Sequence, residues 1–191
     1  MNSLANAGGL VIGFVFGAIV TLFVLRFLAE VCRADFNNPL CQVLYRYTNP
    51  ILQPLRRVLP TFRRWNTAAL VLAYLAELVK LLLGFALVGA MPSVPGLLVL
   101  GLAELVDYFV MLYVVLVFAW SLMSMMSTDR YHPVIRLVGS LVEPVLRPLR
   151  GRIVLGGLDF SPAVVILALM LLRVTLVLMI SDIGMRLAGG T

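Results

Sequence analysis

Four long runs of apolar residues limit what this 191-residue chain can fold into. A helix needs about 20 mostly apolar residues to cross the hydrocarbon core of a bilayer, and there it must satisfy its own backbone hydrogen bonds. The composition agrees, because 62% of the residues are hydrophobic and 13% are charged, against about 45–50% and about 25% in soluble domains. We therefore predict an all-α membrane protein whose four transmembrane helices cover about residues 10–28, 67–90, 104–124 and 163–183.

A short motif occurs twice between these runs. The pattern Pro-aliphatic-Leu-x-Pro-Leu-Arg lies within Asn49–Arg57 and again within Glu143–Arg150. The prolines Pro39 and Pro133 have the same offset as the two motif copies, so the register holds without a gap. Each half is a span, a basic segment and a second span, and both halves have the same orientation. The chain therefore divides into two tandem two-helix repeats, residues 1–90 and 97–191.

Both copies of the motif lie in basic connecting segments. Residues 32–66 contain six arginines and one aspartate, and residues 128–159 contain five arginines. The positive-inside rule places both segments on the cytoplasmic side and both termini on the other side. The segments alternate apolar residues with arginines and prolines, and each proline removes a backbone donor. We therefore predict short helical pieces and turns on the inner leaflet instead of one long straight helix.

The repeated prolines and arginines are the predicted contact site for anionic lipid or a protein partner. Each Lys or Arg near an anionic leaflet contributes about 1 kcal/mol to binding, and the prolines fix the backbone shape. The alternative is an ordinary basic loop that only sets the topology, for which charges alone suffice. The predicted site residues are Pro50, Pro54, Arg56, Arg57, Pro144, Arg147, Pro148 and Arg150.

Glu77, Lys80 and Arg173 are ionisable side chains well inside the predicted spans. An Arg, Lys or Asp at mid-bilayer costs about 2.5–3.5 kcal/mol on insertion scales, so we expect each to have a partner. Glu77 and Lys80 lie three residues apart on one helix face. Glu77 and Arg173 are equally far from the cytoplasmic starts of their helices, at Asn66 and Pro162. We hypothesise a Glu77–Arg173 pair, with Lys80 as a competing partner, which either locks the bundle or lines an ion or proton path.

Gly9, Gly13 and Gly17 recur at every fourth position of the first span. Such a strip lets another helix approach closely, in this chain or in a second copy. Glycine is also frequent in membrane helices, so the alternative explanation is that this spacing arose by chance. We predict a helix-packing strip here. In the last turn of the same span, we expect Arg26 to extend toward the lipid headgroups.

The sequence contains no recognisable catalytic or metal-binding constellation. His132 is the only histidine, and the spacing of Cys32 and Cys41 matches no common zinc or redox pattern. Paired histidines and a nucleophile elbow are also missing. We therefore predict no enzyme activity, no cofactor and no metal. Because the arginines gather beside the spans, their charge indicates topology and lipid contact, and we expect no nucleic-acid partner.

The motifs together resemble the YggT family of bacterial inner-membrane proteins, which is related to YlmG-type proteins of Gram-positive bacteria and plastids. The resemblance covers essentially the whole chain and rests on Asn49–Pro60, Glu143–Arg150 and the Gly-Gly-Leu-Asp-Phe-Ser-Pro turn of Gly156–Pro162. The first repeat lacks this turn. The resemblance implies a multi-pass inner-membrane protein with periplasmic termini. It also implies a role in osmotic-stress tolerance, cell division or envelope organisation, and in plastid relatives in cytochrome assembly and nucleoid distribution.

Two functions remain open at this point. The favoured one is a non-enzymatic scaffold or assembly factor whose basic segments meet anionic lipid or a protein partner. The alternative is a small transporter or channel component in the osmotic response. It requires a homo-oligomer, because four spans are few for a monomeric pore. It predicts a wet path whose candidate lining residues are Glu77, Lys80, Arg173, Glu104 or Asp107. A membrane enzyme is the least supported reading.

Overall fold

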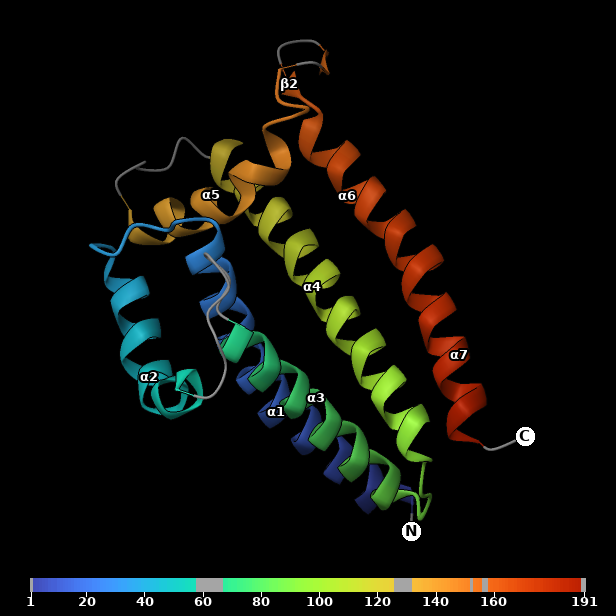
Figure 1. Cartoon of the computed structure of the whole chain (residues 1–191). Coiled ribbons are helices and arrows are strands. Elements are labelled where there is room, and N and C mark those ends of the chain that lie inside the picture. Colours follow the sequence, from blue (N-terminus) through green and yellow to red (C-terminus); the bar gives the residue numbers. More distant parts are fainter. Residues whose placement is uncertain (1, 58–66, 126–131, 152, 156–157, 190–191) are drawn as a thin grey trace.

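Helices dominate the computed structural model, which describes residues 2–57, 67–125, 132–151, 153–155 and 158–189. Four helical segments are long and apolar enough to cross a membrane, which confirms the predicted class. These spans are Ala5–Val31, Thr67–Leu87, Val94–Met125 and Ser161–Ala188. Figure 1 shows them as long, inclined rods.

The elements follow the predicted order of span, connecting segment and span. The first three spans are α1 (Asn2–Val31), α3 (Thr67–Leu87) and α4 (Val94–Met125). The fourth runs through α6 (Ser161–Leu172), the π-helical turn η1 (Arg173–Val177) and α7 (Leu178–Ala188). The connecting helices are α2 (Pro39–Arg56) and α5 (Pro133–Leu146). A small antiparallel hairpin pairs β1 (Val154–Leu155) with β2 (Leu158–Asp159).

The third span is longer than predicted. We placed its start near residue 104, whereas α4 is one continuous helix from Val94. The side chain of Ser93 explains the earlier start, because its Oγ accepts a hydrogen bond from the N–H of Gly96 (3.2 Å). Pro95 lies in the first turn, where a helix does not need the missing N–H. The end of the proline-rich stretch therefore belongs to the first turn of α4.

Helices α2 and α5 begin in the same way. Asn38 Oδ1 accepts the N–H of Leu40 (2.9 Å), and His132 Nδ1 accepts the N–H of Val134 (3.3 Å). Proline occupies the first turn of both helices, at Pro39 and Pro133. The two starts also touch, because Asn38 Nδ2 donates to the carbonyl of Pro133 (2.7 Å). The connecting segments of the two repeats are therefore joined at equivalent points.

The predicted break of the first connecting segment into short pieces is wrong. Helix α2 continues through Pro50 and Pro54 to Arg56. Each proline removes only one N–H, and both prolines are exposed, so the carbonyls left without that donor lie where water or headgroups reach them. Figure 1 shows α2 changing direction in its C-terminal half, as proline commonly causes.

The turn before α6 ties the second repeat together. Asp159 Oδ1 accepts the N–H of Ser161 (2.9 Å), and the Ser161 hydroxyl donates to the carbonyl of Leu149 (2.7 Å). The hydrogen bonds from Ser161 lower the pKa of Asp159. The Gly-Gly part of this motif, residues 156–157, lies outside the described residues. The Asp and Ser of the motif thus hold the start of α6 against the end of α5.

Helix α4 is the central element of the bundle. It packs against α3 on one side and against α6, η1 and α7 on the other, while α1 packs against α3. The alanines Ala69 and Ala73 of α3 are buried in one apolar cluster with Val20 of α1, and their small side chains suit the close packing of α1 and α3. Gly184 of α7 faces Leu100 of α4, where an added Cβ would come within 2.8 Å of the leucine side chain. Small residues therefore set the close helix contacts in both halves.

Both chain ends lie at one end of the bundle, together with the α3–α4 turn (Figure 1). Helices α2 and α5 and the hairpin lie at the opposite end. The Ser93 hydroxyl donates to the carbonyl of Leu187 (2.6 Å), which fastens the α3–α4 turn to the end of α7. This arrangement agrees with a topology that puts the two basic segments on one side and the two termini on the other.

Candidate functional site

Five charged side chains meet near the middle of the apolar helices, and we call them the membrane charge cluster. They are Glu77 and Lys80 of α3, Glu104 and Asp107 of α4, and Arg173 at the start of η1. At 1.5 Å per residue, Glu77 and Glu104 each lie about 15 Å from the starts of their helices, which enter from opposite ends of the bundle. A hydrocarbon core is about 30 Å thick, so the cluster lies near the bilayer midplane.

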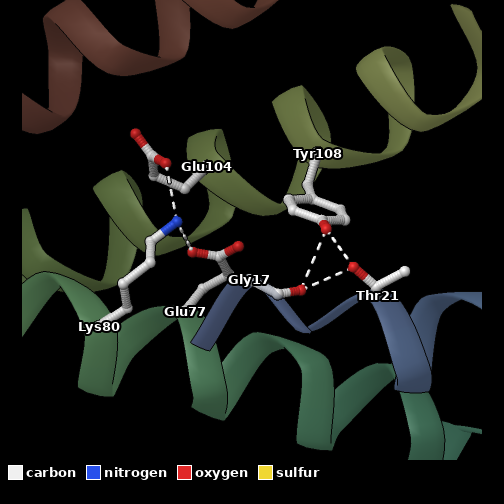
Figure 2. Close-up of polar contacts among 6 residues, drawn as sticks. All are labelled: Gly17, Thr21, Glu77, Lys80, Glu104 and Tyr108. Carbon is white, nitrogen blue, oxygen red and sulfur yellow. Dashed lines mark hydrogen bonds and ion pairs between the residues drawn. The ribbon is translucent and has the colours of Figure 1, made fainter. Parts of the chain in front are cut away.

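Lys80 joins the two glutamates of the cluster (Figure 2), and we call these three residues the triad. Its ammonium forms an ion pair with Glu77 on the same helix, and Nζ lies 3.2 Å from Oε2 of Glu104 on α4. The Glu77 side chain is fully buried, that of Lys80 is 21% exposed and that of Glu104 is 46% exposed. The triad therefore runs from the interior of the bundle to its surface.

Arg173 binds Asp107 and not Glu77, so the hypothesised Glu77–Arg173 pair is wrong. Arg173 Nε lies 2.5 Å from Asp107 Oδ1, and its Nη2 lies 3.2 Å from Oδ2. The reason is that α4 lies between α3 and η1 and offers a nearer carboxylate. The partner of Glu77 is Lys80, which we had named as the competitor. Arg173 also opens η1, and π-helical turns are frequent at functional sites.

An uncharged group of hydrogen bonds appears beside the triad in Figure 2. The Gly17 carbonyl accepts the hydroxyls of Thr21 (2.7 Å) and Tyr108 (3.0 Å), and the two hydroxyls also contact each other. A hydroxyl has one hydrogen to donate, so both are used within this group. Sequence reasoning missed it, because single Thr and Tyr residues in apolar runs carry no spacing signal.

Placing the membrane charge cluster inside a bilayer costs free energy, and the helices do not fully cover its side chains. Charged residues at the bilayer centre cost about 2.5–3.5 kcal/mol each on insertion scales, and ion pairing offsets part of that. The side chains of Glu104 and Arg173 nevertheless stay 46% and 42% exposed, on a surface that lipid tails would otherwise contact. The cluster therefore links α3, α4 and η1 and also presents charge at mid-membrane depth.

A second polar cluster joins the end of α1 to α2. The Arg26 side chain is only 1% exposed, and its Nη2 lies 2.7 Å from Glu30 Oε1 and 3.2 Å from Asn49 Oδ1. Its guanidinium carbon lies 3.1 Å from the ring centre of Tyr45, and Arg56 also reaches Glu30 (2.8 Å). The expectation that Arg26 extends to the headgroups is therefore wrong, because α2 covers it. Burial raises the pKa of Tyr45 to about 12, so its hydroxyl stays neutral.

The repeated motif covers the C-terminal ends of α2 and α5 and the residues that follow them. Its exposed members are Pro50, Pro54, Arg57, Pro144, Arg147, Pro148 and Arg150. Arg150 pairs with Glu143 (2.8 Å), and the partly buried Arg56 pairs with Glu30. Within the described part of the motif, Arg57 and Arg147 have no ion pair. These two arginines are therefore the ones most available to an outside partner.

The glycine strip of α1 has open space where side chains would stand, although the carbonyl of Gly17 accepts the hydroxyl of Tyr108 on α4. Gly9 and Gly13 are exposed and Gly17 is partly exposed, and a Cβ added to any of them would meet nothing within 4 Å. The strip is open to lipid or to a second copy. Packing through it stays a prediction about self-association.

The described residues offer no metal-binding group of three or more His, Cys, Asp and Glu side chains. Cys32 and Cys41 are free thiols, and burial raises the pKa of both, which disfavours the reactive thiolate form. The side chain of His132 is used as a helix cap. The membrane charge cluster and the motif arginines are thus the two candidate sites.

The sequence matches the family model described as CCB3/YggT over residues 1–87 and 99–180. Each matched segment lies within one of the two predicted repeats. The chain is 35% identical over 163 residues to an uncharacterized protein of Pseudomonas aeruginosa, which covers 82% of this chain and 81% of the relative. No solved structure matches.

Two further relatives have the same extent. The chain is 29% identical over 182 residues to the uncharacterized protein YggT of Escherichia coli K12, covering 93% of this chain and 95% of that protein. It is 31% identical over 170 residues to an uncharacterized protein in the proC 3′ region of Vibrio alginolyticus, with coverages of 86% and 90%. The likeness therefore spans both halves of the chain and of its relatives.

Proposed function

Since this chain belongs to the CCB3/YggT family of membrane proteins, we propose that it is a non-enzymatic scaffold or assembly factor of the bacterial inner membrane. Its proposed role lies in envelope organisation under osmotic stress or in cell division. The working surface is formed by α2 and α5 against the cytoplasmic leaflet. Anionic lipid binds there first, and a protein partner uses the same exposed arginines.

The observation that carries this proposal is the pairing of two amphipathic helices at one end of the bundle (Figure 1). Leu52 of α2 and Leu141 of α5 are almost completely buried, whereas the motif arginines Arg57 and Arg147 are exposed. A helix with one apolar and one basic face suits the headgroup boundary of an anionic membrane. Two such helices side by side make one broad basic surface.

This surface is also firmly held, as a scaffold requires. Asp35, in the turn between α1 and α2, forms an ion pair with Arg136 of α5. Asn38 donates to the carbonyl of Pro133, and Arg56 pairs with Glu30 of α1. The two connecting helices are thereby fixed to each other and to the membrane spans.

Replacing the two unpaired motif arginines tests the lipid contact. At about 1 kcal/mol for each cation, the variant Arg57→Gln/Arg147→Gln should bind anionic lipid about 30-fold more weakly. Mass spectrometry of lipid retained by the purified chain measures the ratio of anionic to zwitterionic lipid. The control is Arg186→Gln, which changes an exposed arginine of α7 at the opposite end of the bundle. Equal retention by both variants and wild type would rule out this surface, and a pull-down from membranes compares protein partners in the same variants.

The second candidate function is a small oligomeric transporter or channel component of the osmotic response. The observation in its favour is the exposed charge at mid-membrane depth, on Glu104 and Arg173. This function predicts ion flux through the purified chain in liposomes after an osmotic step. It also predicts that Glu77→Gln and Arg173→Gln each change the flux. No flux from folded protein would leave the cluster as a structural lock.

A further inference from the structure

The membrane charge cluster contains one more carboxylate than it has cations. Glu77, Glu104 and Asp107 face Lys80 and Arg173. Arg173 and Asp107 satisfy each other through two bonds of 2.5 and 3.2 Å. The excess negative charge therefore belongs to the triad, where one ammonium serves two carboxylates. A net charge is strongly disfavoured at this depth, because no bulk water solvates it.

Glu77 is the member of the triad that tolerates a charge least. Its side chain is fully buried, and its Oε2 is the oxygen paired with Lys80. No described residue donates a hydrogen bond to Oε1. In Figure 2 the second carboxylate oxygen points away from Lys80, to the side on which Gly17 lies. The hydroxyls of Thr21 and Tyr108 on that side are already used on the Gly17 carbonyl and on each other. An ionised Glu77 would therefore keep one carboxylate oxygen unsatisfied.

We propose that the triad is a proton-binding site, in which the carboxyl groups of Glu77 and Glu104 share one proton at neutral pH. One carboxylate then pairs with the Lys80 ammonium, and the other group is a neutral acid. Like charges that share a site disfavour simultaneous ionisation. The titratable or charged groups around the shared proton are Lys80 of α3, Asp107 and Tyr108 of α4, and Arg173 of η1. The facing residues of α1, Gly17 and Thr21, are neutral.

The different exposure of the two glutamates gives this site a direction. Glu104, at 46% exposed, lies at the surface end of the triad, and the fully buried Glu77 lies at its interior end. A proton exchanging at Glu104 reaches the interior by moving to Glu77 past the Lys80 ammonium. This site is separate from the lipid-binding surface of α2 and α5, so it stands or falls independently of the proposed scaffold function.

Infrared spectroscopy of the purified full chain, in a detergent without ester groups, tests the proposal at pH 7. A glutamate with an ordinary pKa of about 4.3 is ionised there, so a carboxylic acid C=O band reports an unusual group. Wild type should show a band equivalent to one acid per chain. Glu77→Gln and Glu104→Gln should each abolish the band, because the remaining carboxylate then matches Lys80 one to one. Lys80→Met should about double it, since no cation remains for either carboxyl.

The matched control is Glu143→Gln, which removes an exposed glutamate outside the cluster and should leave the band unchanged. Absence of the acid band from wild type at pH 7 would overturn the proposal, and this measurement needs no variant to fold. A band that survives both glutamate substitutions would overturn it as well, by assigning the proton to another carboxyl. The wild-type band could also disappear when sodium chloride replaces choline chloride at constant pH. This result would overturn the proposal, because the site would then bind an alkali cation in place of the proton.

Discussion

For the stability of the fold, we expect the carboxylate of Glu30 to matter more than the buried Arg26 side chain whose charge it balances. The Arg26 side chain is 1% exposed and lies 2.7 Å from Glu30. Removing one partner of a buried pair costs about 3–5 kcal/mol. Because Arg26 keeps Asn49 and Tyr45, we expect Glu30→Gln to lower the free energy of unfolding by about 3 kcal/mol. Arg26→Met should cost less, since it removes the buried charge and leaves Glu30 paired with Arg56. Unfolding by SDS in mixed micelles measures both changes.

The control for this comparison is another ion pair of the same chemistry on the surface. Glu143 and Arg150 lie 2.8 Å apart with side chains 46% and 53% exposed. Exposed pairs contribute about 0–1 kcal/mol, so Glu143→Gln should change the unfolding free energy by no more than that. A loss for Arg26→Met equal to or above that for Glu30→Gln would show that the packing of the arginine stem, and not the charge pair, dominates this cluster.

At the scale of helices, the spans were predictable because each one carries its own signal. About 20 apolar residues in a row predict a crossing helix whatever its neighbours are. The equal offset of Pro39 and Pro133 predicted a shared register of the two repeats, and both prolines lie in the first turn of their helices, a local preference of proline. Boundaries were less predictable. Whether Pro50 and Pro54 end a helix depends on whether the freed carbonyls reach a polar surface, which the local sequence does not state.

The contacts between helices could not be predicted in the same way, because they depend on which helix lies between which. The equal depth of Glu77 and Arg173 along their helices suggested that these two residues pair. Helix α4 packs against both α3 and η1, however, and its Asp107 forms the ion pair with Arg173. The position of α4 also brings Tyr108 to the Gly17 carbonyl of α1. Counting residues along a helix predicts how deep a side chain lies in the membrane. It does not predict the direction in which that side chain points, which depends on the rotation of the helix about its axis. All five members of the membrane charge cluster were therefore named from the sequence as candidates for a wet path, but the pairing of Arg173 with Asp107 was not predicted.

At the scale of the whole molecule, the two repeats do different work. The unpaired motif arginines come from both repeats, because Arg57 directly follows α2 and Arg147 directly follows α5. The membrane charge cluster instead draws on α3, α4 and η1, and α1 supplies only neutral groups to it. Because α4 packs against spans of both repeats, it connects them. A basic surface at one end and a charged centre in the middle thus arise from one duplicated plan that has diverged.

The proposed orientation makes a prediction for the entire chain, because it puts α2 and α5 in the cytoplasm and the α3–α4 turn in the periplasm. Met91 of that turn is 88% exposed, and Gln53 is exposed on α2. In a background with Cys32 and Cys41 changed to alanine, Met91→Cys should react with a membrane-impermeant maleimide in intact spheroplasts. Gln53→Cys should react only after the membrane is opened. The reverse pattern would place the motif arginines at the periplasmic leaflet. It would contradict the proposal that they bind anionic lipid of the cytoplasmic leaflet.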